Sequence, residues 1–132
     1  MLAEGGNTNI VRDVISLEVE GLAGGKGKAT RYEIVSKEEL NGHGRLYARI
    51  VLKPGSSVGW HQHIHDTEPY YILRGEGDFL EGNTGDGERK RTRVHAGQVC
   101  VIQVGQWHSL ENNSDGELEF MALIYNEPGY MN

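Results

Sequence analysis

A chain of 132 residues is the size of one domain, and its formal charge of -6, without a long basic run, argues against a nucleic-acid surface. Its single cysteine, Cys100, cannot form an intrachain disulfide, and the sequence has neither a signal-peptide pattern nor a membrane-spanning apolar run. We therefore expect a single-domain cytoplasmic protein that binds neither nucleic acid nor membrane, with a core over about residues 10–125 and loose termini at 1–9 and 128–132.

Nineteen glycines are spread along the chain without any period, which indicates many tight turns rather than a linker or a repeat. The segments between these glycines are short and include several with alternating apolar residues. Short strands separated by glycines are typical of a β-sandwich or a β-barrel, so the sequence predicts an all-β fold.

The N-terminal third predicts two strands separated by a loop. Residues Ile10 to Glu20 alternate between apolar and polar side chains, which is typical of a half-buried strand. Residues 21–29 (GLAGGKGKA) indicate a mobile loop, and a second strand runs from Thr30 to Val35. The order Ser36-Lys37-Glu38-Glu39 is that of a capping box and predicts one helical turn.

The clearest strand pattern runs from Arg45 to Lys53. One of its faces is aliphatic, and the other carries Arg45, Tyr47 and Arg49. If the second face were the interior, the guanidinium of Arg49 would clamp a carboxylate substrate. The wholly aliphatic opposite face favours the alternative, in which Arg49 is exposed.

Later segments complete the strand pattern. Strands are predicted at Glu76 to Leu80 and at Glu117 to Tyr125, with a flexible connection at Gly82 to Glu88. The basic run from Arg89 to Arg93 indicates a solvated strand edge, which would discourage aggregation between sheets. Cys100 could bind a soft metal, but the sequence favours a small buried hydrophobic residue.

Between these strands lies the stretch that carries the chemistry. His61, His63 and His65 occupy alternate positions, and an ideal strand would project all three imidazoles from one face. Glu68 follows, and a bend with a returning strand would bring it over His61 and His63. Imidazole is the commonest protein ligand for a divalent transition metal, and a carboxylate adds negative charge and a harder donor. This pattern predicts a metal site.

Two stretches resemble the two motifs of the cupin superfamily. The first motif is matched with every spacing intact by Gly55, His61, His63, Glu68 and Gly75. The second is matched by Gly97, Gly105, His108 and Asn112, but Gln103 stands where proline is usual. The resemblance implies a double-stranded β-helix, or jelly-roll, barrel over roughly Ile10 to Tyr125.

The resemblance also implies a ligand set. His61, His63, Glu68 and His108 would bind one divalent metal ion, which remains open among manganese, iron, nickel, cobalt, copper and zinc. Such a set leaves one or two coordination positions open, as in a catalytic site. His65 has no role in the motif and either touches the metal or a ligand, or lies at the barrel rim.

Neighbours of these residues are candidates for the surroundings of the site. Tyr70 and Ile72 share a strand face with Glu68, so they are expected to line a pocket or to support the ligands. Trp60 and Trp107 each precede a ligand histidine and should face away from it by alternation. We expect both tryptophans to pack behind the site.

The function implied by the resemblance is metal-dependent action on a small oxygen-rich molecule, as a dioxygenase, a decarboxylase or an isomerase. The alternatives are a non-catalytic module that binds or senses a small molecule through its metal, and a barrel in which the metal only stabilises the fold. Because a jelly roll has open sheet edges, we also expect a homodimer in which the first strand crosses to the partner through the loop at 21–29.

Overall fold

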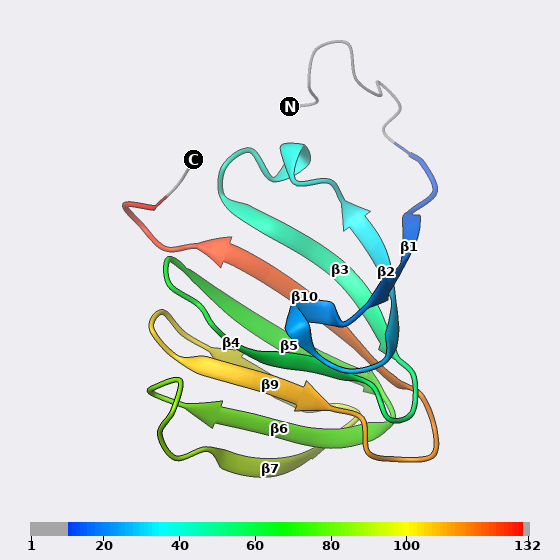
Figure 1. Ribbon diagram of the computed structural model, residues 1–132. Helices are drawn as coiled ribbons and strands as arrows, with labels where there is room; N and C mark the ends of the chain where they lie inside the picture. Colours follow the sequence, from blue (N-terminus) through cyan, green and yellow to red (C-terminus); the bar gives the residue numbers. More distant parts are fainter. Residues whose placement is uncertain (1–10, 131–132) are drawn as a thin grey trace.

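The computed structural model describes residues 11–130, which fold into two antiparallel sheets that face each other (Figure 1). The larger sheet has the order β1-β2-β3-β10-β5-β8, and the smaller one has the order β4-β9-β6-β7. The strands are β1 (Ile15–Glu20), β2 (Lys28–Val35), β3 (Gly44–Leu52), β4 (Ser57–Gln62), β5 (Asp66–Arg74), β6 (Glu76–Gly82), β7 (Lys90–His95), β8 (Val99–Ile102), β9 (Trp107–Glu111) and β10 (Leu118–Asn126). This arrangement confirms the predicted all-β jelly roll.

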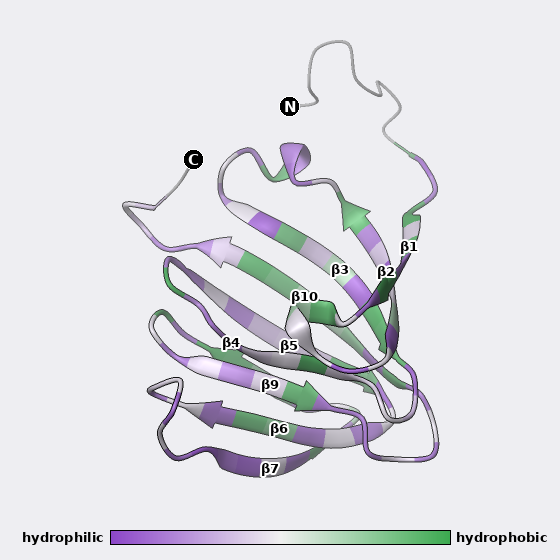
Figure 2. Cartoon of the chain, viewed as in Figure 1, coloured by the Kyte–Doolittle hydropathy of each residue, from purple (hydrophilic) through white to green (hydrophobic). Residues whose placement is uncertain are grey.

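The hydrophobic core fills the space between the sheets. The central pair β3 and β10 places Ile50 opposite Phe120 and Leu52 opposite Leu118, and all four side chains are buried. Apolar and polar residues alternate along most strands because successive side chains point to opposite faces (Figure 2). Cys100 belongs to this core, and its burial raises the pKa of its thiol to about 11. Within residues 11–130, helical structure is limited to short turns that could not cross a membrane.

The first strand is shorter than the sequence pattern predicts. β1 begins at Ile15, whereas the predicted strand began at Ile10; Ile10, the predicted loose terminus at 1–9 and residues 131–132 lie outside the described residues. All six residues of β1 pair antiparallel with β2 of the same chain, from Ile15 opposite Glu33 to Glu20 opposite Lys28.

The segment at residues 21–29, predicted as a mobile loop, contains a helical turn and the start of β2. A 3₁₀ turn, η1 (Leu22–Gly24), lies against β4, and Lys28 already belongs to β2. The Ser57 N–H donates to the Lys26 carbonyl (2.9 Å), and the Lys26 N–H donates to Ser57 Oγ (3.0 Å). Glycines are needed in this segment because its backbone approaches the backbone of β4 closely.

The capping box at Ser36 forms as predicted. The Glu39 N–H donates to Ser36 Oγ (3.2 Å), and the Ser36 N–H donates to Glu39 Oε1 (2.8 Å). These reciprocal bonds begin the short turn η2 (Glu38–Leu40) between β2 and β3.

The motif residues outside the ligand set form the turns that position the strands. The motif glycines at 55, 75, 97 and 105 all have positive φ, between 81° and 92°, which other residues adopt only with strain. The buried side chain of Asn112 donates to the carbonyls of Leu52 and Gly116. At the position where proline is usual, the Gln103 N–H donates to Gln106 Oε1 (3.1 Å), so the substitution gains a hydrogen bond that proline could not make.

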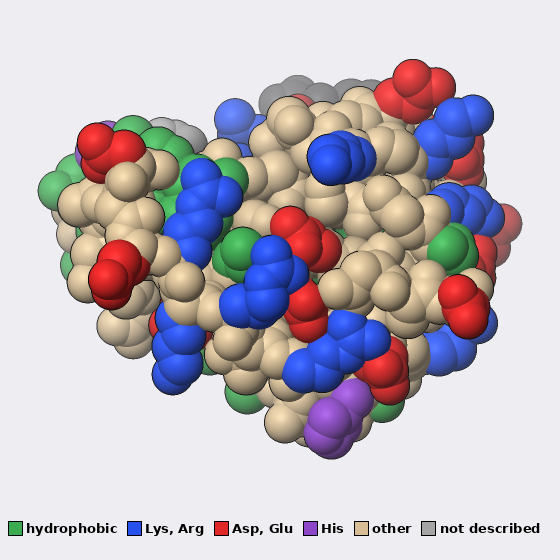
Figure 3. All heavy atoms as spheres, turned by 60° about the horizontal axis from the view of Figure 1, so that its bottom comes forward, with side chains coloured by type: hydrophobic (Ala, Val, Ile, Leu, Met, Phe, Trp, Pro, Cys, Tyr) green, Lys and Arg blue, Asp and Glu red, His purple; other side chains and the backbone are tan. Residues whose placement is uncertain are grey.

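The basic run at Arg89 to Arg93 is exposed and lies at the sheet edge formed by β7, as predicted, and its arginines pair with acidic side chains. Arg91 pairs with Asp78 (2.7 Å) and Glu111 (2.8 Å), and Arg93 pairs with Asp78 and Glu76. Figure 3, in which the bottom of the Figure 1 view comes forward, shows acidic and basic side chains interleaved on this face. The four-stranded sheet therefore presents a charge-paired outer surface.

Candidate metal centre

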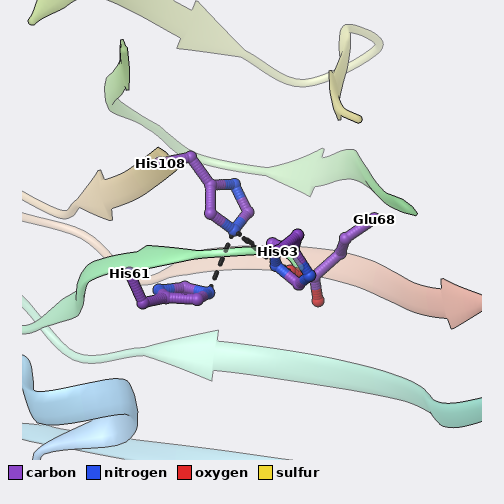
Figure 4. A group of neighbouring side chains, drawn as sticks. All are labelled: His61, His63, Glu68 and His108. Atoms are coloured by element: carbon purple, nitrogen blue, oxygen red, sulfur yellow. Dashed lines mark hydrogen bonds and ion pairs between the residues drawn. The ribbon is translucent and has the colours of Figure 1, made fainter. Parts of the chain in front are cut away.

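Three histidines and one glutamate from separate segments meet between the sheets. His61 lies on β4, His63 directly after it, Glu68 on β5 and His108 on β9. One ligand atom from each lies within 4.8 Å of the others. Figure 4 shows the four side chains pointing toward one another. The structure therefore brings together all four residues that the sequence predicts as ligands.

The backbone that positions these residues is not one ideal strand. β4 is irregular just before His61 and ends one residue before His63. The His63 N–H donates to the Gln106 carbonyl (3.0 Å), and its carbonyl accepts from the Gly105 N–H (2.6 Å). His61 lies opposite His108 in the β4–β9 pairing. The turn before β9 thus holds His63 beside His61 and His108, which the β4–β9 pairing places opposite each other.

Hydrogen bonds to the histidine rings determine which nitrogen is available to a metal. His61 Nδ1 lies 2.7 Å from the Gly59 carbonyl, and His63 Nδ1 lies 2.5 Å from Asp66 Oδ1. A carbonyl and an ionised carboxylate only accept, so each Nδ1 carries the proton and each Nε2 presents its lone pair. His108 Nε2 lies 3.0 Å from that of His63 and 3.1 Å from that of His61. Lone pairs that face each other at this distance need a cation or a shared proton between them.

Glu68 supplies the negative charge of the cluster. Its Oε1 lies 2.9 Å from His63 Nε2 and 3.2 Å from His108 Nε2. Because His63 Nε2 carries no proton, it cannot donate to this buried oxygen, which has no hydrogen-bond donor outside the histidine cluster among the described residues. Burial alone would raise the pKa of Glu68, but the neighbouring rings of His108 and His63 outweigh it and lower this pKa to about 2. The carboxylate is therefore ionised at neutral pH.

The three histidines differ in their titration. Burial lowers the pKa of His61 and of His108, which favours the neutral form that binds metals. Burial also acts to lower the pKa of His63, but interactions with Glu68 and Asp66 outweigh it and raise this pKa. Three neutral imidazoles and one carboxylate fit a divalent transition metal such as zinc, iron or manganese.

A chain of polar contacts supports His63 from behind. Asp66 Oδ1 accepts from His63 Nδ1, and its other oxygen, Oδ2, accepts from Arg45 Nε at 2.9 Å. Asp66 is buried, whereas the Arg45 side chain is half exposed. A carboxylate that holds the distal nitrogen of a ligand histidine orients the ring and increases its basicity.

A cavity of about 230 Å³ opens beside the cluster. His61 and Glu68 form part of its wall, so a molecule in the cavity can reach the ligands. Its other lining residues are polar at Arg31, Arg45 and Tyr70, and apolar at Leu22, Ala23, Leu46, Ile50, Val58 and Ile124. The Tyr70 ring also stacks on His108, with centroids 5.0 Å apart. Burial and then the charge of Glu68 raise the pKa of Tyr70 well above its usual value, so its hydroxyl keeps its proton.

Other candidates from the sequence lie elsewhere. His65 stands in the bend before β5 and stacks on Tyr130 (4.2 Å between centroids), and Ile72 is fully buried in the core; neither lines the cavity. Trp60 and Trp107 stack on each other, with centroids 6.0 Å apart. Arg49 pairs with Glu119 (3.3 Å) and covers the Tyr32 ring on the outer face of the large sheet. The carboxylate clamp considered for Arg49 is therefore absent.

Three residues of the site carry no motif signal. The pairing of β2 with β3 positions Arg31 and Arg45, and the bend that follows β4 positions Asp66. Asp66 stands between two motif positions, and a carboxylate three residues after a ligand histidine is the signal that could have identified it. Arg45 belongs by alternation to the outer face of its strand, so only the structure brings it to the cavity.

Comparisons with known sequences identify the family of the chain. Residues 48–124 match the family model of the cupin domain. The oxalate-binding protein of Thermotoga maritima is 42% identical over 106 residues, which cover 80% of this chain and 83% of that protein. An acireductone dioxygenase of Tuber melanosporum is 28% identical over 113 residues, which cover 84% of this chain and 60% of that protein.

Solved structures of other proteins are also similar to this chain. The crystal structure of a protein from Thermotoga maritima, described as a predicted oxalate decarboxylase, matches with a TM-score of 0.79 and 39% identity and covers 90% of this chain and 100% of its own. The cupin domain of Drosophila melanogaster CENP-C matches with a TM-score of 0.63 and 15% identity, over 84% of this chain and 70% of its own. At that identity, the likeness concerns the fold alone.

Proposed function

The chain belongs to the cupin family, and we propose that it binds one divalent transition metal ion through His61, His63, Glu68 and His108 and a small oxygen-rich molecule beside it. The observation that carries this proposal is the convergence of three histidine Nε2 atoms, two of them unprotonated, on the buried oxygen of an ionised carboxylate. A cation among them would take up the facing lone pairs and compensate the buried charge.

The cavity supports a small carboxylate as the bound molecule. Its volume of about 230 Å³ suits a compound of few atoms, and its polar lining includes the guanidinium groups of Arg31 and Arg45. The relative from Thermotoga maritima is named for oxalate binding, which agrees with a carboxylate ligand. When bound, the metal would supply a Lewis acid that polarises a ligand oxygen.

Catalysis on the bound molecule is the second candidate function. The buried Tyr70 keeps its hydroxyl proton and lines the same cavity as Glu68, so this chain holds a neutral hydrogen-bond donor beside its ligands that could orient a reacting oxygen. The named activity of the acireductone dioxygenase relative favours an enzyme as well, as a dioxygenase, a decarboxylase or an isomerase. Product formed from oxalate, and lost after chelation, would favour catalysis; stabilisation without product would favour a binding module.

Metal analysis of protein purified without a histidine tag tests the first proposal. We expect about one ion per chain, and loss of most of it in His61→Ala and in His108→Ala, because each removes one of four ligands. His95→Ala is the matched control, since this exposed histidine lies outside the cluster and should retain full metal. Full stoichiometric metal in the His61→Ala/His108→Ala double variant would refute the assignment.

A further inference from the structure

We propose that Arg31 selects a short dicarboxylate as the ligand of this cavity, by binding the carboxylate group that the metal centre does not take. This inference rests on the proposed function, because it assumes that the other carboxylate lies at the metal ligands. It goes further by naming the ligand class and the residue that recognises it.

The strand register places Arg31 on the inner side of the large sheet. Arg31 of β2 lies opposite Ile50 of β3 on one side and opposite Leu17 of β1 on the other. Ile50 is a core residue, so the side chain of Arg31 shares the face that covers the cluster. It lines the same cavity as His61 and Glu68. A charged side chain at such a position requires a partner that the core does not provide.

The partners of Arg31 are incomplete. Its Nη2 lies 3.3 Å from Glu33 Oε1, and both side chains are partly exposed. Its Nε is buried and has no hydrogen-bond acceptor among the described residues. A guanidinium has five N–H donors in a fixed planar fork that matches a carboxylate. A carboxylate in the cavity would give the buried Nε–H the acceptor that the protein lacks.

Arg45 does not duplicate this role. Its Nε already donates to Asp66 Oδ2 (2.9 Å), and Asp66 in turn holds the ligand His63. Asp66 therefore balances the charge of Arg45 and engages its guanidinium in supporting the cluster. Arg31 remains as the cation of the cavity with an unsatisfied buried donor.

The buried donor of Arg31 favours two carboxylates over one. Glu68 offsets one charge of a divalent ion, which leaves a single positive charge at the cluster for the first carboxylate. Glu33 offsets the charge of Arg31, as Asp66 offsets that of Arg45, but it contacts Nη2 and leaves Nε free. A second carboxylate of the same molecule would accept from this Nε–H. A monocarboxylate bound at the metal would leave the Nε–H of Arg31 buried without an acceptor.

Calorimetric titration of the manganese-loaded protein tests this selection. Oxalate is the dicarboxylate probe, and glycolate is the monocarboxylate of similar size. Arg31→Met keeps an unbranched apolar stem but removes the guanidinium. We expect this variant to weaken oxalate binding about 100-fold and glycolate binding less than about threefold, because a site built to bind a polar group discriminates strongly against its loss. Arg74→Met is the matched control, since Arg74 pairs at the surface with Glu117 and Glu119 and should change neither affinity.

Each outcome distinguishes this inference from the proposed function. Metal content is measured on the same samples after dialysis. Absence of metal from the wild-type chain would refute the proposed function. Full metal with equal oxalate affinity in wild type and Arg31→Met would refute the role of Arg31 alone. If Arg31→Met fails to fold, Arg31→Lys keeps the charge without the fork and should lose about tenfold for oxalate. Wild-type protein that binds glycolate at least as tightly as oxalate would also overturn the inference.

Discussion

Each histidine of the cluster depends on a different neighbour for its orientation. The Gly59 carbonyl holds His61, and the Asp66 carboxylate holds His63, whereas His108 Nδ1 is buried without a partner among the described residues. The stack with Tyr70 therefore restrains the ring of His108 by packing rather than by a hydrogen bond. Of the two polar supports, only that of His63 comes from a side chain that can be replaced without altering the backbone.

Replacement of Asp66 by Asn should weaken metal binding without removing a ligand. The amide keeps the shape of the side chain but loses the negative charge that His63 Nδ1–H and Arg45 both contact. We expect the metal affinity to fall about 10- to 100-fold, which is typical for groups that support a ligand histidine. Competition with a chromophoric chelator measures this change directly.

Asp78→Asn provides the control for that prediction. Asp78 also pairs with arginines, Arg91 and Arg93, but it lies on the four-stranded sheet away from the cluster. Its loss should leave the metal affinity unchanged. Equal affinities in the Asp66→Asn variant and the wild type would show that Asp66 does not support the ligand.

The ligands could be predicted from the sequence, but their supports could not. The four ligands stand at motif spacings, and these spacings can be recognised in the sequence without knowing the fold. They are His61, His63, Glu68 and His108. Arg31 reaches the cavity only because of the register between β2 and β3, which no local pattern in either strand reveals. His65 follows the same alternation as the ligands, yet the bend before β5 turns it to Tyr130.

At the scale of elements, the contact between η1 and β4 determines the position of His61. A Cβ on Gly59 would lie 2.2 Å from the Ala23 carbonyl oxygen and 2.7 Å from the Gly25 nitrogen, so only glycine allows this approach. Composition alone suggested mobility for residues 21–29, because glycine at a turn and glycine at a close contact look alike in sequence. The strands themselves were predictable, since their alternation depends on the core they share.

Gly59→Ala should therefore destabilise the fold and disturb the site. The added methyl group meets backbone atoms that cannot move independently, and such overpacking costs about 1–3 kcal/mol of the free energy of unfolding. The shift should also weaken metal binding, because the Gly59 carbonyl accepts from the His61 ring. Urea denaturation of the metal-free protein measures the first effect, and chelator competition measures the second.

Gly116→Ala is the matched control for that substitution. A Cβ on Gly116 would meet no heavy atom within 4 Å, so its stability should stay within about 0.5 kcal/mol of wild type. If Gly59→Ala is as stable as this control, the approach of η1 to β4 is not as close as described.

At the scale of the whole molecule, the two sheets differ in width, and the edge of the larger one is left partly uncovered. Ile15 and Leu17 of β1 lie on the inner side of that sheet, opposite Glu33 and Arg31, yet they are 54% and 40% exposed. β1 pairs with β2, and the segment after it is bonded to β4; in a dimer with an exchanged first strand the same contacts would form between two chains. The homodimer with a crossing first strand remains our expectation, and we add that the exposed apolar side of β1 forms part of its interface.

Ile15→Ser/Leu17→Ser should therefore convert a dimer into a monomer. The double variant removes the apolar surface whose burial would drive association, while the pairing of β1 with β2 depends on backbone bonds and persists. Light scattering after size exclusion, at micromolar concentration, gives the mass of each species. Val99→Ser/Val101→Ser is the control, because these exposed residues lie on β8 at the opposite edge of the same sheet. A wild-type monomer would refute the homodimer. Dissociation only in Val99→Ser/Val101→Ser would show that the interface lies at the β8 edge instead.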